Sequence, residues 1–198
     1  TRYKRKYLAP LVEVRAAEAI RVRIIGGIYR HRQLKFISDT QTRPTKDRIR
    51  EAVFSALGHN CLNRRVLDLF AGSGSMGLEA LSRGAKEASF VDTRQEAIAI
   101  IRQNISDLEA NGQAFFDSYD HFLQMSGDTF DLVFIDPPYA FDDYKILFTD
   151  LLKPTLLSQD AIIVIENQSS NFFVPEEFII TRQYKYGETL VHVLRRKV

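Results

Sequence analysis

The chain has 198 residues, of which 45% are hydrophobic, enough for one well-packed domain with a small appendage. No apolar stretch approaches the ~20 residues that cross a bilayer, and the basic start TRYKRKYLAP lacks the apolar core of a secretion signal. The single cysteine, Cys61, excludes an internal disulfide framework and, with only four histidines, argues against a zinc cluster. We therefore expect no metal and a reducing, cytoplasmic setting.

Charge is unevenly distributed, although the net charge is only +2. Residues 1–50 hold 14 lysines and arginines against 4 acidic residues, whereas residues 51–198 hold 13 against 21. A basic arm on an acidic body is typical of a protein that binds a polyanion, and a solvated N-terminus would explain the composition equally well. Apolar and aromatic residues interleave with the charges in RVRIIGGIYRHRQLKF, which favours a folded basic element.

The N-terminal part is predicted to form a small arm. Two short alternating runs, RVRII and RQLKF, flank Gly26 and Gly27 and predict a hairpin that turns at these glycines. The segment TRPTKDRIREAVFSAL then predicts a helix with Pro44 at its entry and Gly58 at its end. Residues 1–20 carry no comparably strong pattern and are predicted as a basic extension.

Strands and helices alternate in the remainder of the chain. Strands are predicted at residues 65–70, 88–91, 113–116, 132–135, 161–166, 178–186 and 189–198. Helices are predicted at residues 75–83, 96–112, 119–125 and 143–152. The last two strands are joined too tightly around Gly187 for a parallel crossover, so they predict an antiparallel hairpin.

This pattern predicts an α/β fold, a doubly wound, mostly parallel seven-stranded Rossmann-like sheet with an antiparallel C-terminal hairpin. Three parts are expected: the extension at residues 1–20, a hairpin-and-helix arm at residues 21–60, and the sheet domain at residues 61–198. Ligands bind outside the carboxyl ends of the strands in such sheets. We therefore expect the site residues directly after the carboxyl ends of the predicted strands.

A glycine-rich loop follows the first strand of the sheet. Gly72, Gly74 and Gly77 match G-x-G-x-x-G between a strand and a helix, a spacing that suits a dinucleotide or another adenosine compound. Asp68, four residues earlier, would repel a pyrophosphate and attract a ligand with a cationic amino-acid end. A carboxylate that caps backbone N–H groups is the structural alternative for Asp68.

Two further strand ends carry acidic residues. Asp92 ends SFVD and is placed to accept both hydroxyls of a ribose, or to cap the next helix. In FFDSYD, either Asp117 or Ser118 falls where an adenine amino group would be bound, with Asp117 preferred. Asp120 is expected to face solvent in the first turn of a helix.

The stretch FDLVFIDPPYAFDD ends the fourth strand with a carboxylate, a rigid corner and an aromatic ring. A nucleobase amine is a poor nucleophile because its lone pair is delocalised into the ring, so a site must orient it and accept its N–H bonds. Asp136 and the Pro137 carbonyl supply acceptors that Pro137 and Pro138 fix in direction, and Tyr139 can stack on a base. A strand-ending turn alone would explain only the prolines.

DPPY with an upstream D-x-F-x-G-x-G resembles the class I S-adenosylmethionine-dependent methyltransferases that modify exocyclic amines. RIIGGIYRHRQL, TRPTKDRIRE and LDLFAGSGSMGLEALSRGA resemble, more narrowly, the bacterial 16S rRNA guanine-N2 methyltransferase family, from about residue 21 to the C-terminus. The resemblance implies methyl transfer to N2 of a guanine in small-subunit rRNA, guanine 966, during ribosome assembly.

The resemblance also implies roles for individual residues. The target base would be held by Asp136, Pro137, Pro138 and Tyr139. S-adenosylmethionine would contact Asp68, Phe70, Ala71, Gly72, Gly74, Gly77, Asp92, Asp117 or Ser118, and Arg43 and Thr45 beside Pro44. The RNA would contact Arg23, Arg30, His31, Arg32, Lys35 and Arg48. The partner would be 16S rRNA or an assembling small subunit, bound by a monomer.

Three alternatives stay open at this point. DPPY also occurs in adenine-N6 methyltransferases of DNA or RNA, although an arm of about sixty residues leaves little room for a DNA-recognition region. An NAD-dependent oxidoreductase would use the glycine loop and Asp92 but has no role for Asp68 or DPPY. A non-catalytic RNA-binding assembly factor would not need the aspartates Asp68, Asp92 and Asp136 at the strand ends.

Overall fold

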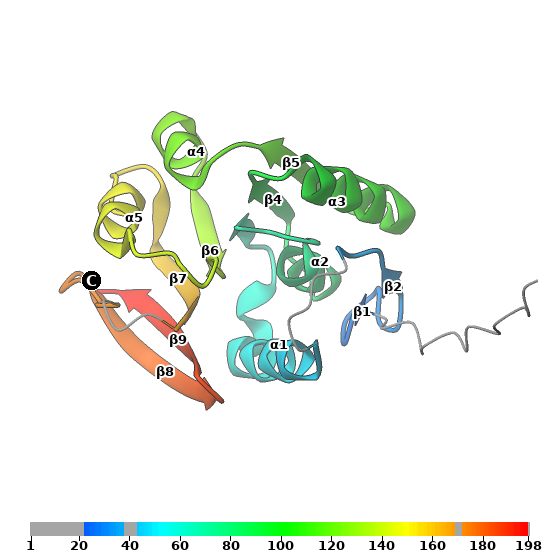
Figure 1. The fold of residues 1–198 in the computed structure, drawn as a ribbon, viewed down its shortest axis with the longest axis horizontal. Coiled ribbons are helices and arrows are strands. Elements are labelled where there is room, and N and C mark those ends of the chain that lie inside the picture. Colours follow the sequence, from blue (N-terminus) through cyan, green and yellow to red (C-terminus); the bar gives the residue numbers. More distant parts are fainter. Residues whose placement is uncertain (1–21, 38–42, 169–171, 198) are drawn as a thin grey trace, which may run out of the picture.

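A seven-stranded sheet carries the fold, which a computed structural model describes over residues 22–37, 43–168 and 172–197 (Figure 1). The predicted extension at residues 1–20 lies outside the described residues, as do the side chains of Arg43 and Thr45 that were expected beside the cofactor. The longest described helix has 15 residues, and none in these ranges is apolar and long enough to cross a bilayer.

The elements follow the predicted alternation. The strands are β1 (Val22–Arg23), β2 (Gln33–Leu34), β3 (Arg65–Leu69), β4 (Glu87–Asp92), β5 (Gly112–Phe116), β6 (Phe130–Ile135), β7 (Leu157–Asn167), β8 (Phe178–Tyr186) and β9 (Thr189–Arg196). The helices are α1 (Arg43–Leu57), the 3-10 helix η1 (Gly58–Cys61), α2 (Ser75–Ser82), α3 (Gln95–Leu108), α4 (Tyr119–Met125) and α5 (Tyr144–Leu151).

The strand order of the sheet is β5-β4-β3-β6-β7-β9-β8. Strands β3 to β7 are mutually parallel, and β9 runs antiparallel to both β7 and β8. The predicted fold class is therefore confirmed, including the antiparallel C-terminal hairpin. The order reverses between β3 and β6, and such a reversal opens a crevice at the carboxyl ends of the two strands.

Helices cover both faces of the sheet (Figure 1). Phe134 and Val164 pack in one core with α1, α2 and α3, whereas Ile135 and Ile165 pack in the other with α4 and α5. Successive side chains of a strand point to opposite faces. The residue that follows Ile135 is consequently directed back toward the face that α1 covers.

A buried carboxylate joins the arm to the sheet domain. Glu79 of α2 is fully buried, and its two oxygens accept the N–H groups of Ile25 and Gly26, both at 2.8 Å. Arg83 Nε donates to the same carboxylate at 2.8 Å, and Arg50 Nε of α1 lies 3.9 Å from it. Arg50 also donates to the Arg23 carbonyl at 2.7 Å. One carboxylate thus connects the hairpin, α1 and α2.

The N-terminal hairpin is confirmed, but its predicted turn at the two glycines is wrong. Val22 pairs with Leu34 in β1 and β2, and the chain reverses at residues 28–31. Gly27 instead lies against the end of α2 with φ 78°, where a Cβ atom would collide with the Ser82 backbone. The glycines therefore permit close docking on α2, and a longer loop makes the turn.

The predicted end of the helix at residues 96–112 is also wrong. α3 ends at Leu108, four residues before Gly112, and Glu109 caps it in the left-handed conformation with φ 52°. Gly112 opens β5 and pairs with Ala88. A Cβ atom there would lie 2.9 Å from the Phe90 ring, so the glycine is required by the close approach of β5 to that ring.

The Glu79 anchor leads to a stability prediction. Glu79→Gln should lower the free energy of unfolding by about 3 kcal/mol, because a buried charged network loses its anion. Urea denaturation measures this change, and hydrogen exchange at the Ile25 and Gly26 amides should accelerate. Glu51→Gln on the exposed side of α1 is the matched control. An equal loss in both variants would contradict the anchoring role.

Candidate functional site

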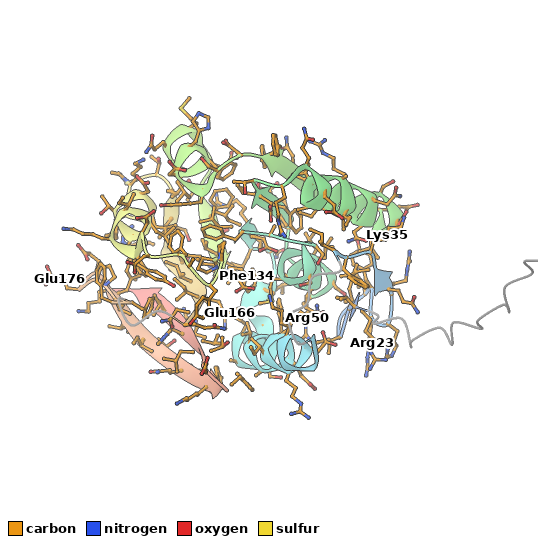
Figure 2. All side chains as sticks on the ribbon, in the orientation of Figure 1. Arg23, Lys35, Arg50, Phe134, Glu166 and Glu176 are labelled. Carbon is orange, nitrogen blue, oxygen red and sulfur yellow. The ribbon has the colours of Figure 1, made fainter. Side chains whose placement is uncertain are left out.

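Four carboxyl side chains gather at the carboxyl edge of the parallel strands. Asp68 lies in β3, Asp92 ends β4, Asp136 follows β6, and Glu166 lies near the end of β7. Figure 2 labels Phe134 of β6 and Glu166 of β7, both on the side of the sheet that α1 covers. Carboxylates that lie close together repel one another, and a bound cation or a ligand with several N–H donors relieves this repulsion. This edge of the sheet therefore suits such ligands.

Asp68 is the buried member of this group. Its Oδ2 atom accepts the Gly77 N–H at 2.9 Å, which fixes the start of α2 against β3. Burial, together with the charges of Asp136 and Asp92, raises the pKa of the Asp68 carboxyl to about 8. Asp68 therefore accepts a backbone N–H, as its structural alternative expected. This bond uses only Oδ2, so it is compatible with the predicted attraction of a cationic ligand.

Asp92 holds the glycine-rich loop from the neighbouring strand. Its Oδ2 atom accepts the Gly72 N–H at 2.9 Å, and its Oδ1 atom accepts the Arg94 N–H at 2.9 Å. The Arg94 guanidinium also donates to both oxygens, at 3.1 and 3.2 Å. A ribose diol at Asp92 would have to share or replace these guanidinium bonds.

The third strand end places Asp117 and Ser118 at the start of α4. The Asp117 carboxylate accepts the Ser118 N–H at 2.8 Å and lies 2.8 Å from His121 Nδ1. This hydrogen bond and the charge of Asp117 raise the pKa of the exposed His121. Ser118 caps α4 by accepting the His121 N–H at 3.4 Å. Which of the two contacts an adenine stays a prediction.

An aromatic cluster connects the glycine-rich loop to the segment after DPPY. Phe70 has a left-handed backbone with φ 90°, an uncommon conformation for a bulky residue. Its ring centroid lies 5.4 Å from that of Tyr119 and 5.4 Å from that of Phe141. Phe141 in turn lies 5.0 Å from Tyr144 of α5. The loop and the DPPY segment therefore share one packed support.

The DPPY segment lines a pocket of about 150 Å³ together with residues of α1 and β7. The Asp136 carboxylate accepts from Lys46 Nζ at 3.2 Å, and the Tyr139 ring is 71% exposed. The Pro138 carbonyl accepts the Phe141 N–H at 2.8 Å, which closes the turn after the prolines. A carboxylate and an accessible aromatic face thus lie side by side at this pocket.

Two charged lining residues of this pocket were missed by the sequence predictions. Lys46 lies in the TRPTKDRIRE motif, and Glu166 lies near the end of the fifth parallel strand. The rule that pointed to four strand ends would have found Glu166 if it had been applied to this strand as well. No local pattern of the sequence indicates that Lys46 reaches Asp136.

The side chains predicted to bind RNA lie on the exterior of the arm. Arg23, Arg30, His31, Arg32, Lys35 and Arg48 are all exposed. Arg32 donates to the Asp107 carbonyl at 2.6 Å, and Lys35 forms an ion pair with the Asp107 carboxylate at 3.2 Å. These two contacts dock the hairpin on α3.

The residues present fit S-adenosylmethionine better than a dinucleotide. A buried carboxyl whose pKa lies near 8 suits an ammonium group, and the acidic neighbours Asp92 and Asp136 would repel a pyrophosphate. Asp92 holds the loop through Gly72 N–H, and its contact with a ribose stays a prediction. Within the described ranges, no three histidine, cysteine, aspartate or glutamate side chains gather as metal ligands would.

Comparison with known proteins adds sequence and structural relatives. The family model described as conserved hypothetical protein 95 matches residues 22–195. The Bacillus subtilis (strain 168) protein YlbH is 34% identical over 184 residues, covering 89% of this chain and 100% of its own length. Ribosomal RNA small subunit methyltransferase D of Escherichia coli (strain K12) is 31% identical over 179 residues, covering 89% and 90%. The solved structure of Escherichia coli yhhF gives a TM-score of 0.81 at 31% identity, covering 89% and 98%.

The raised pKa of Asp68 gives a prediction for pH dependence. Near pH 7 the carboxyl is largely protonated, and a cation bound beside it favours the ionised form, so binding should release a proton. The affinity for S-adenosylmethionine should therefore increase from pH 6 toward pH 8. Calorimetry in two buffers of different ionisation enthalpy measures the release.

Asp68→Asn should abolish this proton release, and Asp128→Asn at an exposed, remote position should leave it intact. Release of the same size from the Asp68→Asn protein would assign the proton to another group.

Proposed function

This chain belongs to the family described as conserved hypothetical protein 95, the RsmD family, and on that premise we propose that it methylates N2 of a guanine in small-subunit rRNA. It is an S-adenosylmethionine-dependent rRNA methyltransferase. The proposed target nucleotide is guanine 966. The enzyme is proposed to act as a monomer on an assembling small subunit. The observation that carries the proposal is the Asp136 carboxylate at the DPPY pocket, beside the acidic loop that suits the cofactor.

When bound, the cofactor supplies a methyl group made electrophilic by its sulfonium. Asp136 accepts one N–H of the target amine, which localises the nitrogen lone pair, stabilises the positive charge that develops on nitrogen, and provides an acceptor for the proton that the methylated amine loses. The two prolines and the bond from Phe141 N–H to the Pro138 carbonyl hold this acceptor in place. Tyr139 offers a ring face on which the extruded base can stack.

Lys46 of α1 balances the charge of Asp136 in the wall of the pocket. Its Nζ atom lies 3.2 Å from Asp136 Oδ2, and the two side chains are 52% and 39% exposed. Such an exposed pair contributes little to stability. Its contribution is therefore to orient the carboxylate.

The exposed basic side chains of the arm provide the complementary surface for rRNA. Arg30 and His31 lie in the turn of the hairpin, next to Ile28, whose side chain is 79% exposed. Cations on such a protruding turn suit phosphate contacts, which position a nucleic acid without reading its sequence. The hairpin is rigidly attached because Glu79 accepts two of its backbone N–H groups.

The function is tested by transfer of tritiated methyl groups to small ribosomal subunits from a strain lacking the enzyme. Nucleoside analysis should find the label in N2-methylguanosine. Label in N6-methyladenosine would retain the site and overturn the choice of base. Cofactor binding without transfer to any RNA would favour a non-catalytic assembly factor.

Asp136→Asn should lower kcat at least about 100-fold, as expected when a preorganised electrostatic group is removed from a transition state. The Kd for S-adenosylmethionine should stay within about threefold, since this residue acts on the amine and not on the cofactor. Single-turnover kinetics and calorimetry measure the two quantities. The exposed neighbour Asp142→Asn is the control, and near-normal turnover in Asp136→Asn would exclude the mechanism.

Arg30→Glu should weaken RNA binding and reduce the slope of log K against log salt concentration by about 1, because a phosphate contact is lost. Filter binding to small-subunit rRNA across a salt series measures the slope. Lys86→Glu at the amino edge of the sheet is the control. An unchanged slope in Arg30→Glu would remove this residue from the interface.

A further inference from the structure

Glu166 has no part in the mechanism so far, yet it lies at the level of Asp136. Strands β6 and β7 are parallel, with Phe134 paired to Val164 and Ile135 to Ile165. The next residue of each chain segment is Asp136 on one side and Glu166 on the other. Because side chains alternate between faces, both carboxyl groups are directed toward the face that α1 covers.

The two carboxyl groups line the same pocket. Its wall includes Lys46, Asp136, Pro137, Tyr139 and Glu166. The neighbouring polar residue, Asn167, has its amide oxygen 2.9 Å from His192 Nε2, so that group is engaged with the sheet interior. Glu166 is consequently a second acceptor facing the place where the target base is expected.

The protein surroundings of Glu166 disfavour its ionised form. Burial raises the pKa of Glu166 to about 8, the charges of Asp136 and Asp68 add to the rise, and Lys46 opposes it. A ligand that brings N–H donors to this carboxyl favours its ionised form. Ionisable groups in a pocket whose pKa is strongly perturbed are often functional. This agrees with the position of Glu166 beside Asp136 in the pocket wall.

We infer that Glu166 reads the Watson–Crick edge of the target guanine by accepting its N1–H and one of its N2–H bonds. The inference rests on the proposed guanine-N2 activity. Guanine carries three N–H bonds here: N1–H and one N2–H lie along the Watson–Crick edge, and the second N2–H is directed toward N3. Asp136 accepts one N2–H, and Glu166 accepts the other together with N1–H. Adenine presents an acceptor at N1, which an ionised Glu166 would repel.

The test uses an analogue that keeps the reacting amine and removes N1–H. 2,6-Diaminopurine retains N2, has an acceptor at N1 in place of N1–H, and carries an amino group in place of the C6 carbonyl, a second change whose effect on the ratio is common to the wild type and the variant. Small subunits are reconstituted from rRNA that carries either guanine or this analogue at the position that the wild-type enzyme methylates. The ratio of kcat/KM for the two substrates is then measured for the wild type and for Glu166→Gln.

The wild type should prefer guanine at least about tenfold, since a bidentate contact with a base edge discriminates by such a factor. Glu166→Gln should shift the ratio at least about tenfold toward the analogue, because an amide can donate to N1 while its oxygen accepts from N2. Glu176→Gln, at an exposed glutamate away from the pocket, should keep the wild-type ratio (Figure 2).

Two controls separate the possible failures. Thermal unfolding and calorimetric binding of S-adenosylmethionine should be near normal in Glu166→Gln, which shows that the variant is folded. An unchanged ratio in this folded variant would overturn the inference and leave the proposed function standing. Label in N6-methyladenosine from the wild-type enzyme would overturn both.

Discussion

The arrangement of this protein depends on the buried carboxylate of Glu79. It accepts two backbone N–H groups of the hairpin loop and one N–H of Arg83, and it lies near Arg50 of α1. A buried anion is tolerated only when such donors surround it, so the hairpin, α1 and α2 are held in one relative position. α1 then presents Lys46 to the Asp136 carboxylate across the pocket.

The strand ends concentrate negative charge at the proposed active site. Asp68, Asp136 and Glu166 face the same side of neighbouring strands, and their mutual repulsion contributes to the raised pKa values of Asp68 and Glu166. The protein therefore holds carboxyl groups that bound cations or N–H donors would stabilise in the ionised form. The sulfonium cofactor is one such partner, and the edge of the proposed target guanine is the other.

Much of the fold could be predicted because local patterns are strong in this chain. Alternating apolar runs and Gly-rich turns indicated all seven strands of the sheet and the helices between them. The errors concerned glycines. Gly27 and Gly112 were assigned to a turn and a helix end, whereas the structure uses their missing side chains for close approach to Ser82 and to Phe90. The residues that require a glycine at these positions are distant in the sequence, so the local sequence pattern around each glycine does not reveal the requirement.

The sequence by itself determined the class of fold and the chemical groups at the strand ends, including the glycine-rich loop with Asp68 and the DPPY segment with Asp136. These follow from periodicity and from short motifs, both of which are local. Only the tertiary structure decided that Lys46 and Glu166 share a pocket with Asp136. The physical reason is that strand order and register come from long-range pairing, which places β7 beside β6 and rests α1 on the same face of the sheet.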